Sequence, residues 1–215
     1  MRKTIFSALI ACLCVITGLN AQDQSDSDFN KWQVRLRGIS ITPNESASID
    51  AIGGDAEIKG AFVPELDFTY FFSEKWSAEI ILGTANHDVK AVSTDAGDIN
   101  LGDVWLLPPT LTLQYHFATE GLRPYIGAGF NYTIFYGVDE GPVLDAIDYD
   151  NSFGLAFQGG IDFDLDEKWF LNLDAKYITM NTDVTVDATT ALGATVGADV
   201  DINPLVIGFG IGMKF

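Results

Sequence analysis

The chain has 215 residues, of which 47% are hydrophobic, and its 30 acidic and 12 basic side chains give a formal net charge of −18. This charge excludes nucleic acid as a partner, because phosphate binding needs clustered Lys and Arg side chains. Beyond the N-terminal region the longest apolar run, Leu205 to Met213, has nine residues, far fewer than the ~20 that a membrane helix needs. Helical insertion is therefore excluded, whereas strands of alternating character are not.

The N-terminus has the three parts of an export signal. Arg2 and Lys3 precede an apolar run from Ile5 to Ile16, and small and polar residues follow up to Ala21. We predict cleavage after Ala21, a periplasmic segment at 22–31, and a mature formal charge of −20, because two basic residues and no acidic residue are removed.

Both cysteines, Cys12 and Cys14, lie inside this signal. An alternative, in which Cys12 carries a lipid, is disfavoured because the apolar run before it would be very short. The mature chain then has no thiol for a disulfide, a nucleophile or a sulfur metal ligand, which is compatible with export to an oxidising compartment.

Eight segments alternate apolar and polar residues with a period of two, and each has about the length of a tilted strand that crosses a bilayer. They are residues 32–41, 61–72, 76–87, 109–117, 123–135, 152–163, 169–180 and 202–215. The bulky apolar side chains share one face, and small or polar side chains share the other. A soluble barrel has its bulk inside, so this pattern predicts an eight-stranded antiparallel transmembrane up-and-down β-barrel over residues 32–215.

Short and long connections alternate between these strands. The short ones are 73–75, 118–122 and 164–168, and the long acidic ones are 42–60, 88–108, 136–151 and 181–201. Barrels of the outer membrane have short periplasmic turns and long outer loops. We therefore expect the long segments to be surface loops and both termini to lie in the periplasm.

Three aromatic residues occupy positions typical of such barrels. Trp76 and Trp169 begin strands after two similar turns, where an interfacial aromatic belt is expected, although two ordinary hairpin turns with a packed Trp are the alternative. The chain ends in Phe215 on the closing strand, which resembles the signal that barrel assembly machinery reads.

Four stretches resemble the OmpW family of outer-membrane proteins. They are Ile41-Thr42-Pro43-Asn44-Glu45, Leu107-Pro108-Pro109-Thr110, Asp201-Ile202-Asn203-Pro204, and the most specific, Arg123-Pro124-Tyr125-Ile126-Gly127-Ala128-Gly129-Phe130-Asn131-Tyr132-Thr133. The segments 42–60 and 181–201 carry no alignable pattern. The resemblance implies an eight-stranded outer-membrane barrel with a narrow, partly apolar lumen that admits small hydrophobic molecules, and it leaves the cargo open.

Inward positions collect charged side chains, namely Arg35, Arg37, Glu65, Asp67, Glu79, Asp162, Asp174 and Lys176. Eight strands leave only enough room for side chains, so these charges must pair. A structural network is the favoured interpretation and a selective ion path is the alternative. Toward the outer mouth, Ile39, Ile41 and Val63 predict an apolar entrance above this network.

The glycines and histidines are further candidates for a functional role. The many inward glycines favour bending of a small barrel over an enlarged lumen. His87 beside Asp88 and Ser93 allows a lipid A-modifying site at the outer leaflet, but no serine stands out as nucleophile, and a solvated or packed role is favoured for His87 and His116. No metal site or cofactor is expected.

The predicted outer loops are acidic, with Asp88, Asp95, Asp98 and Asp103 in the second and Asp139, Glu140, Asp145, Asp148 and Asp150 in the third. Divalent cations shared with lipopolysaccharide are one interpretation, and a solvated surface is the favoured one.

Three functions remain open. The leading one is passive transport of small hydrophobic molecules, with lateral exit into lipid because the polar layer blocks direct passage. The second is a non-transporting surface barrel whose acidic loops mediate interaction or membrane stabilisation. The third is a lipid A-modifying enzyme. The expected partners are outer-membrane lipid, lipopolysaccharide and the assembly machinery.

Overall fold

The structure is a computed structural model that describes residues 30–50, 52–117 and 121–215, without the side chain of residue 192. The expected export signal at 1–21 and most of the segment 22–31 lie outside the described residues. None of the helices in the described part of the chain is long and apolar enough to span a membrane.

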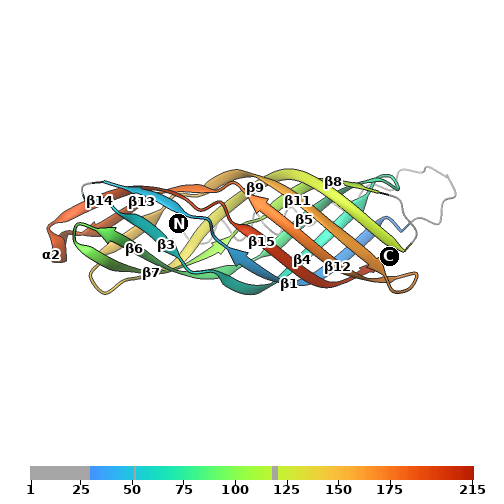
Figure 1. Cartoon of the computed structure of the whole chain (residues 1–215), viewed down its shortest axis with the longest axis horizontal. Helices are drawn as coiled ribbons and strands as arrows, with labels where there is room; N and C mark the ends of the chain where they lie inside the picture. Colours follow the sequence, from blue (N-terminus) through green and yellow to red (C-terminus); the bar gives the residue numbers. More distant parts are fainter. Residues whose placement is uncertain (1–29, 51, 118–120) are drawn as a thin grey trace, which may run out of the picture.

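Eight strands close into an antiparallel barrel, which confirms the predicted fold class (Figure 1). In the order of their pairing they are β1 (Trp32–Thr42), β4 (Ala61–Phe71), β5 (Trp76–Gly83), β8 (Thr110–His116), β9 (Leu122–Glu140), β11 (Ser152–Asp164), β12 (Trp169–Ile178) and β15 (Leu205–Lys214). The ring is closed by β1 and β15, from Gln33 opposite Lys214 to Thr42 opposite Leu205. Each of these strands pairs with two neighbours, so the ring is closed, as the hydrocarbon of a membrane requires.

The outer wall of this ring is apolar. Phe153 and Phe209, for example, are 65% and 61% exposed, whereas the neighbouring inward positions hold small or polar side chains. The predicted outward direction of the bulky side chains is therefore confirmed. Such a surface is stable only where lipid covers it, so we call this part the membrane barrel.

The prediction of long surface loops was wrong, because most of these segments form further strands. They are β2 (Ser46–Ile49), β3 (Asp55–Ile58), β6 (Ala85–Thr94), β7 (Gly97–Leu107), β10 (Ala146–Tyr149), β13 (Asn181–Ala188) and β14 (Ala194–Asp201), and the short helix α2 (Thr189–Leu192) joins the last two. The predicted strand 76–87 is divided at Thr84 into β5 and β6. Together with the distal part of β9 these elements form what we call the extension.

The extension consists of two sheets that continue the barrel away from its short turns. One has the order β9-β7-β6-β3 and the other β10-β13-β14-β2. In Figure 1 the extension forms one end of an elongated molecule, with α2 at its tip, and the C-terminus lies at the opposite end, which we call the turn end.

The pattern of side chains reverses in the extension. Along β13, Thr182 and Val184 are buried while Asp183 and Thr185 are exposed. Along β14, Val196 and Val200 are buried in the same way and the acidic neighbours face outward. Polar-out and apolar-in is the arrangement of a barrel in water, so the extension stands outside the lipid and encloses an apolar interior.

Candidate functional site

The eight charged residues predicted to lie inside the barrel all do so, and none is more than 6% exposed. They come from five different strands, and they meet inside the membrane barrel. We call this group, together with the uncharged side chains that bond to it, the polar plug. Its members are Arg35, Arg37, Glu65, Asp67, Glu79, Asp162, Asp174 and Lys176, with Thr69, Gln114, Tyr125, Gln158 and Asn172.

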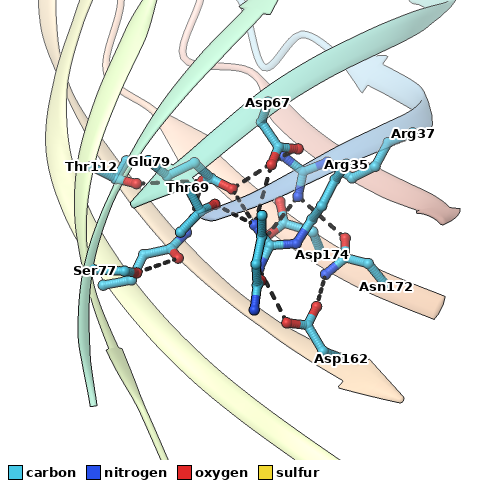
Figure 2. Close-up of polar contacts among 12 residues, drawn as sticks. Arg35, Arg37, Asp67, Thr69, Ser77, Glu79, Thr112, Asp162, Asn172 and Asp174 are labelled. Carbon is cyan, nitrogen blue, oxygen red and sulfur yellow. Dashed lines mark hydrogen bonds and ion pairs between the residues drawn. The ribbon is translucent and has the colours of Figure 1, made fainter. Parts of the chain in front are cut away.

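Arg35 lies at the centre of the plug, as Figure 2 shows. Its Nη1 lies 2.8 Å from Glu79 Oε1 and 3.2 Å from Asp67 Oδ1, and its Nη2 lies 3.1 Å from Asp162 Oδ2. Nη1 also donates a hydrogen bond of 2.7 Å to Thr69 Oγ1. One guanidinium thus joins carboxylates from three other strands, the planar multidentate geometry for which Arg is suited.

Arg37 and Lys176 form the layer of the plug nearer the extension. Arg37 Nη2 lies 2.8 Å from both Glu65 Oε1 and Asp67 Oδ2, and its Nη1 donates to Asn172 Oδ1 at 3.2 Å. Lys176 Nζ donates to both oxygens of Glu65, at 2.9 and 3.0 Å. Every charged side chain of the plug therefore has an opposite charge within the distance of an ion pair, which favours the structural network over the ion path.

Several neutral members of the plug received no role in the sequence analysis. Gln114 and Gln158 each donate to Glu79 Oε2 at 2.7 Å, and the hydroxyl of Tyr125 donates to Asp174 at 2.7 Å. A signal for them existed, because both glutamines occupy inward positions of their strands. A buried carboxylate needs such donors, since its remaining lone pairs cannot reach water.

Phe170 fills the plug at the turn end and is fully buried. The cationic groups of Arg35, Arg123 and Lys214 lie 5.4, 5.2 and 5.9 Å from the centre of its ring. A Cβ added to Gly212 would collide with this ring. At this position the glycine makes room for the Phe170 ring, which is neither the bending nor the enlarged lumen considered from the sequence.

An apolar cavity of about 130 Å³ lies between the plug and the tip of the extension. The predicted mouth residues Ile39, Ile41 and Val63 are in its wall, and Glu65 and Lys176 contribute to its floor. Most of the wall, however, comes from the extension, including Val89, Val104, Ile147, Val184 and Val200. These residues were not predicted from the sequence, because the acidic side chains of their segments indicate solvated loops.

The two histidines occupy different environments. His87 is 5% exposed and lines the apolar cavity, with Nδ1 2.8 Å from the carbonyl oxygen of Lys59. Asp88 lies on the opposite face and pairs with Lys59 Nζ at 3.1 Å. Because His87 points inward, the arrangement considered for a lipid A-modifying site at the outer leaflet does not form.

His116 is buried at the turn end. Its Nε2 lies 2.9 Å from Ser77 Oγ and 3.2 Å from Gln114 Oε1, and its ring packs at 4.6 Å, centre to centre, from Phe71. These contacts fit the packed role favoured from the sequence, and they continue the polar plug toward the short turns.

The wall beside His87 is interrupted between β4 and β6. The ladder of β4 with β5 ends at Glu65 opposite Gly83, and that of β3 with β6 begins at Ile58 opposite Val89. Between them the described strands share only the bond from Lys59 N to Asp88 O, at 3.0 Å, and the His87 side-chain contact. We call this interruption, residues 60–64 opposite 84–87, the seam.

The acidic residues of the extension mostly face water or bond to neighbouring groups. Asp103 accepts from Asn86 at 2.6 Å, and Asp145 accepts from the backbone N–H of Thr190 at 2.7 Å. Burial of the ring and the nearby Asp103 carboxylate raise the pKa of Tyr149 above its ordinary value. No group of three or more His, Cys, Asp or Glu side chains able to hold a metal occurs among the residues that the structure describes.

The predicted interface residues lie at the turn end. Trp76 and Trp169 are each 43% exposed, and the ring of Trp76 contacts that of Tyr115 at 5.1 Å. Phe215 is 56% exposed, and its backbone pairs with that of Trp32 across the closing strands. These positions are compatible with an aromatic belt, and the role of Phe215 in assembly stays a prediction.

Apolar side chains directed at lipid, a closed ring of strands and a charged interior define the class of this protein as an outer-membrane β-barrel. The model of the OmpW family matches residues 30–215, and the chain belongs to that family. The resemblance inferred from the sequence is thereby confirmed.

Relatives with similar sequences support this assignment. The chain is 41% identical to the uncharacterized outer-membrane protein y4mB of Sinorhizobium fredii, covering 86% of this chain and 80% of that protein. It is 31% identical to outer membrane protein W of Vibrio cholerae over the full length of both. It is 33% identical to the dibenzothiophene metabolism operon protein PahQ of Pseudomonas aeruginosa, covering 86% and 88%.

The fold is similar to a solved structure of this class. The crystal structure of the outer membrane protein OprG from Pseudomonas aeruginosa superposes with a TM-score of 0.81 at 30% identity, covering 86% of this chain and 96% of that one. The chain is thus located in the outer membrane.

Proposed function

We propose that this protein is a passive uptake channel for small hydrophobic molecules. In this proposal the extension faces outward, a molecule enters its apolar cavity, and the polar plug prevents it from continuing through the barrel. The molecule then leaves sideways into the lipid of the outer membrane.

The observation that carries the proposal is the boundary between the cavity and the plug. On one side Ile39, Val63 and Val206 form an apolar wall, and on the other side Arg37 and Glu65 form a 2.8 Å ion pair. An apolar molecule gains by leaving water for such a cavity, at roughly 25 cal/mol per Å² of surface removed from water. It gains nothing by entering the plug, where it would separate buried charges that are already paired.

The seam supports a sideways exit. Residues 60–64 form no ladder pairs with residues 84–87 in the described part of the chain. Pro64 has no N–H with which to make one. The wall can therefore part here without breaking a continuous ladder of hydrogen bonds, and the seam lies where the cavity meets the membrane barrel.

One relative adds support from its name. PahQ is named for an operon of dibenzothiophene metabolism. Dibenzothiophene is an apolar aromatic compound, which matches the chemistry of the cavity wall, so we extend this class of cargo to the present chain.

The test is uptake of a hydrophobic dye by proteoliposomes, combined with conductance in planar bilayers. We expect the wild-type protein to deliver dye into the bilayer without conducting small ions. Ile39→Asp and Ile41→Asp should each lower uptake severalfold, because an unpaired carboxylate in an apolar cavity is costly. Thr42→Asp is the control, since Thr42 is on the same strand and faces outward.

Unchanged uptake in both cavity variants, with normal folding, would contradict the proposal. Steady ion conductance would instead favour the ion path. Absence of both uptake and conductance in the wild type would leave the second function, in which the acidic surface interacts with lipopolysaccharide or stabilises the membrane.

The orientation is part of the same proposal. We place the turn end and both termini in the periplasm, with Phe215 as the residue that assembly machinery reads. Protease digestion of intact and permeabilised cells tests this: an epitope inserted next to α2 should be cleaved in both, and a C-terminal epitope only after permeabilisation.

A further inference from the structure

His87 is the polar group that most clearly interrupts the apolar wall of the cavity. It lies on β6 between Ala85 and Val89, which are 4% and 6% exposed and line the same cavity. Among the other polar members of the wall, Glu65 and Lys176 pair with each other, and Thr182 donates to the carbonyl of Asp150.

The contact with Lys59 determines which nitrogen of the ring carries the proton. A carbonyl oxygen only accepts hydrogen bonds, so Nδ1, at 2.8 Å from Lys59 O, must be the donor. In the neutral ring Nε2 is then an acceptor with a free lone pair. Among the described residues Nε2 has no hydrogen-bond partner. This nitrogen is also not fully enclosed by protein atoms.

An acceptor without a partner in an apolar cavity is energetically unfavourable until a ligand donates a hydrogen bond to it. It has lost much of its access to water, and it gains a bond only when something in the cavity offers a hydrogen. A pure hydrocarbon offers none, whereas a molecule with a hydroxyl group on an apolar body matches both the wall and the lone pair.

We propose that His87 Nε2 is a specificity-determining acceptor that selects hydroxylated apolar molecules, such as phenols and alcohols, over hydrocarbons of the same shape. This inference rests on the proposed function, because it names the class of cargo that the same cavity prefers. Carboxylates are disfavoured, since the lone pair of Nε2 opposes an anion and the charge of Lys176 is already paired with that of Glu65.

Two ligands of equal size test the proposal, namely 4-methylphenol and p-xylene, with benzoate as the anionic probe. Binding is measured by NMR titration of the protein in nanodiscs, and transport by uptake into proteoliposomes. Each compound is compared with itself across variants, so its own partition into lipid cancels. We expect His87→Phe to weaken binding of 4-methylphenol about threefold to tenfold, the worth of one hydrogen bond, and to leave p-xylene unchanged.

His87→Gln is the matched control, because its amide oxygen restores an acceptor at a similar position and should recover part of the preference for 4-methylphenol. The ¹⁵N resonance of His87 Nε2 gives a second readout that needs no variant to fold. It should move when 4-methylphenol is added and stay in place with p-xylene. His116, buried in the plug, is the internal reference and should move with neither.

The outcomes separate the two proposals. If His87→Phe weakens binding of both compounds by the same factor, or of neither, the inference is wrong and the proposed function stands. Tighter binding of benzoate than of 4-methylphenol would also overturn the inference, since it would require a charged ring. If the wild type binds neither compound, the proposed function fails and the inference fails with it.

Discussion

The two halves of the interior are opposites. In the membrane barrel the wall outside is apolar and the inside is a solid network of charges, centred on Arg35, which is fully buried. In the extension the wall outside is acidic and the inside is a hollow lined by Ile, Val and Ala. β1 and the stretch of β5 and β6 run from one half into the other without changing which residues point inward.

β5 and β6 show this reversal on a single stretch of chain. Ser77 and Glu79 point inward in β5, and Ala85, His87 and Val89 point inward in β6, so odd-numbered residues face the interior throughout. Only the chemistry changes, at about Thr84. The surroundings outside change from lipid to water at that level, and the buried and exposed faces exchange their character accordingly.

The largest expected effect comes from removing the central cation of the plug. Arg35→Met keeps much of the side-chain volume but leaves Asp67, Glu79 and Asp162 short of a positive charge. Breaking a buried ion network by removing one partner costs about 3–5 kcal/mol. Urea unfolding of the protein in lipid vesicles, followed by tryptophan fluorescence, measures this loss.

The extension supplies the matched control for that variant. Lys59→Ala removes a cation from the pair with Asp88, whose side chains are 73% and 55% exposed, and it should cost less than about 1 kcal/mol. A double variant, Arg35→Met with Glu79→Gln, should be less destabilised than the sum of its single variants. Equal losses for Arg35→Met and Lys59→Ala would show that the plug is hydrated, and the contrast between the halves would disappear.

The next largest effect comes from adding volume to each half. Gly212→Val would drive methyl groups into the ring of Phe170 and should destabilise the barrel by about 1–3 kcal/mol, the usual cost of overpacking. Ala91→Val adds similar volume to the wall of the cavity, where space is available, and should change stability little while lowering uptake of bulky dyes. Unfolding and uptake assays on both variants test whether one half is full and the other hollow; equal destabilisation would contradict this.

The sequence was sufficient for the membrane barrel and insufficient for the extension. Eight strands, the direction of Phe209 and the eight charged members of the plug followed from alternation, because burial in lipid imposes one rule over the whole barrel. The extension was missed because acidic residues such as Asp183 were read as a sign of loops, although the intervening Val184 keeps the same alternation. The packed position of His87 agrees with its odd number, which puts it on the same face as Glu79.

Which cation of the plug contacts which carboxylate could not be predicted from the sequence, for a different reason. Arg35 meets Asp162 across 127 positions of the chain, and which carboxylate it reaches depends on the stagger of the strands around the ring. That stagger is set by the summed register of all eight pairs, whereas a local pattern contains only the direction of each side chain.

The smallest expected effect concerns the tips, where the two halves should behave alike. Asp166 at the turn end accepts backbone N–H bonds from Trp169 and Lys168, both at 2.7 Å, and Asp187 at the tip of the extension accepts bonds from the side chain and backbone of Thr189. These bonds hold the pKa of each carboxyl below its ordinary value. A lowered pKa means that the local stabilisation is complete above the ordinary range of Asp, near pH 4, and is lost as the pH falls through the folded value.

NMR of the backbone amides during acid titration tests this similarity. The amide signals of Trp169 and Thr189 should both move with midpoints below the ordinary pKa of Asp. The amide of Trp76 is the control, because it donates to the hydroxyl of Ser73, which does not titrate, at 3.1 Å. Asp166→Ser should copy that turn and abolish the movement at Trp169. If only one of the two amide signals moves, the difference between the halves extends to their ends. If both move, the difference between the halves is confined to the interior, where plug and cavity meet.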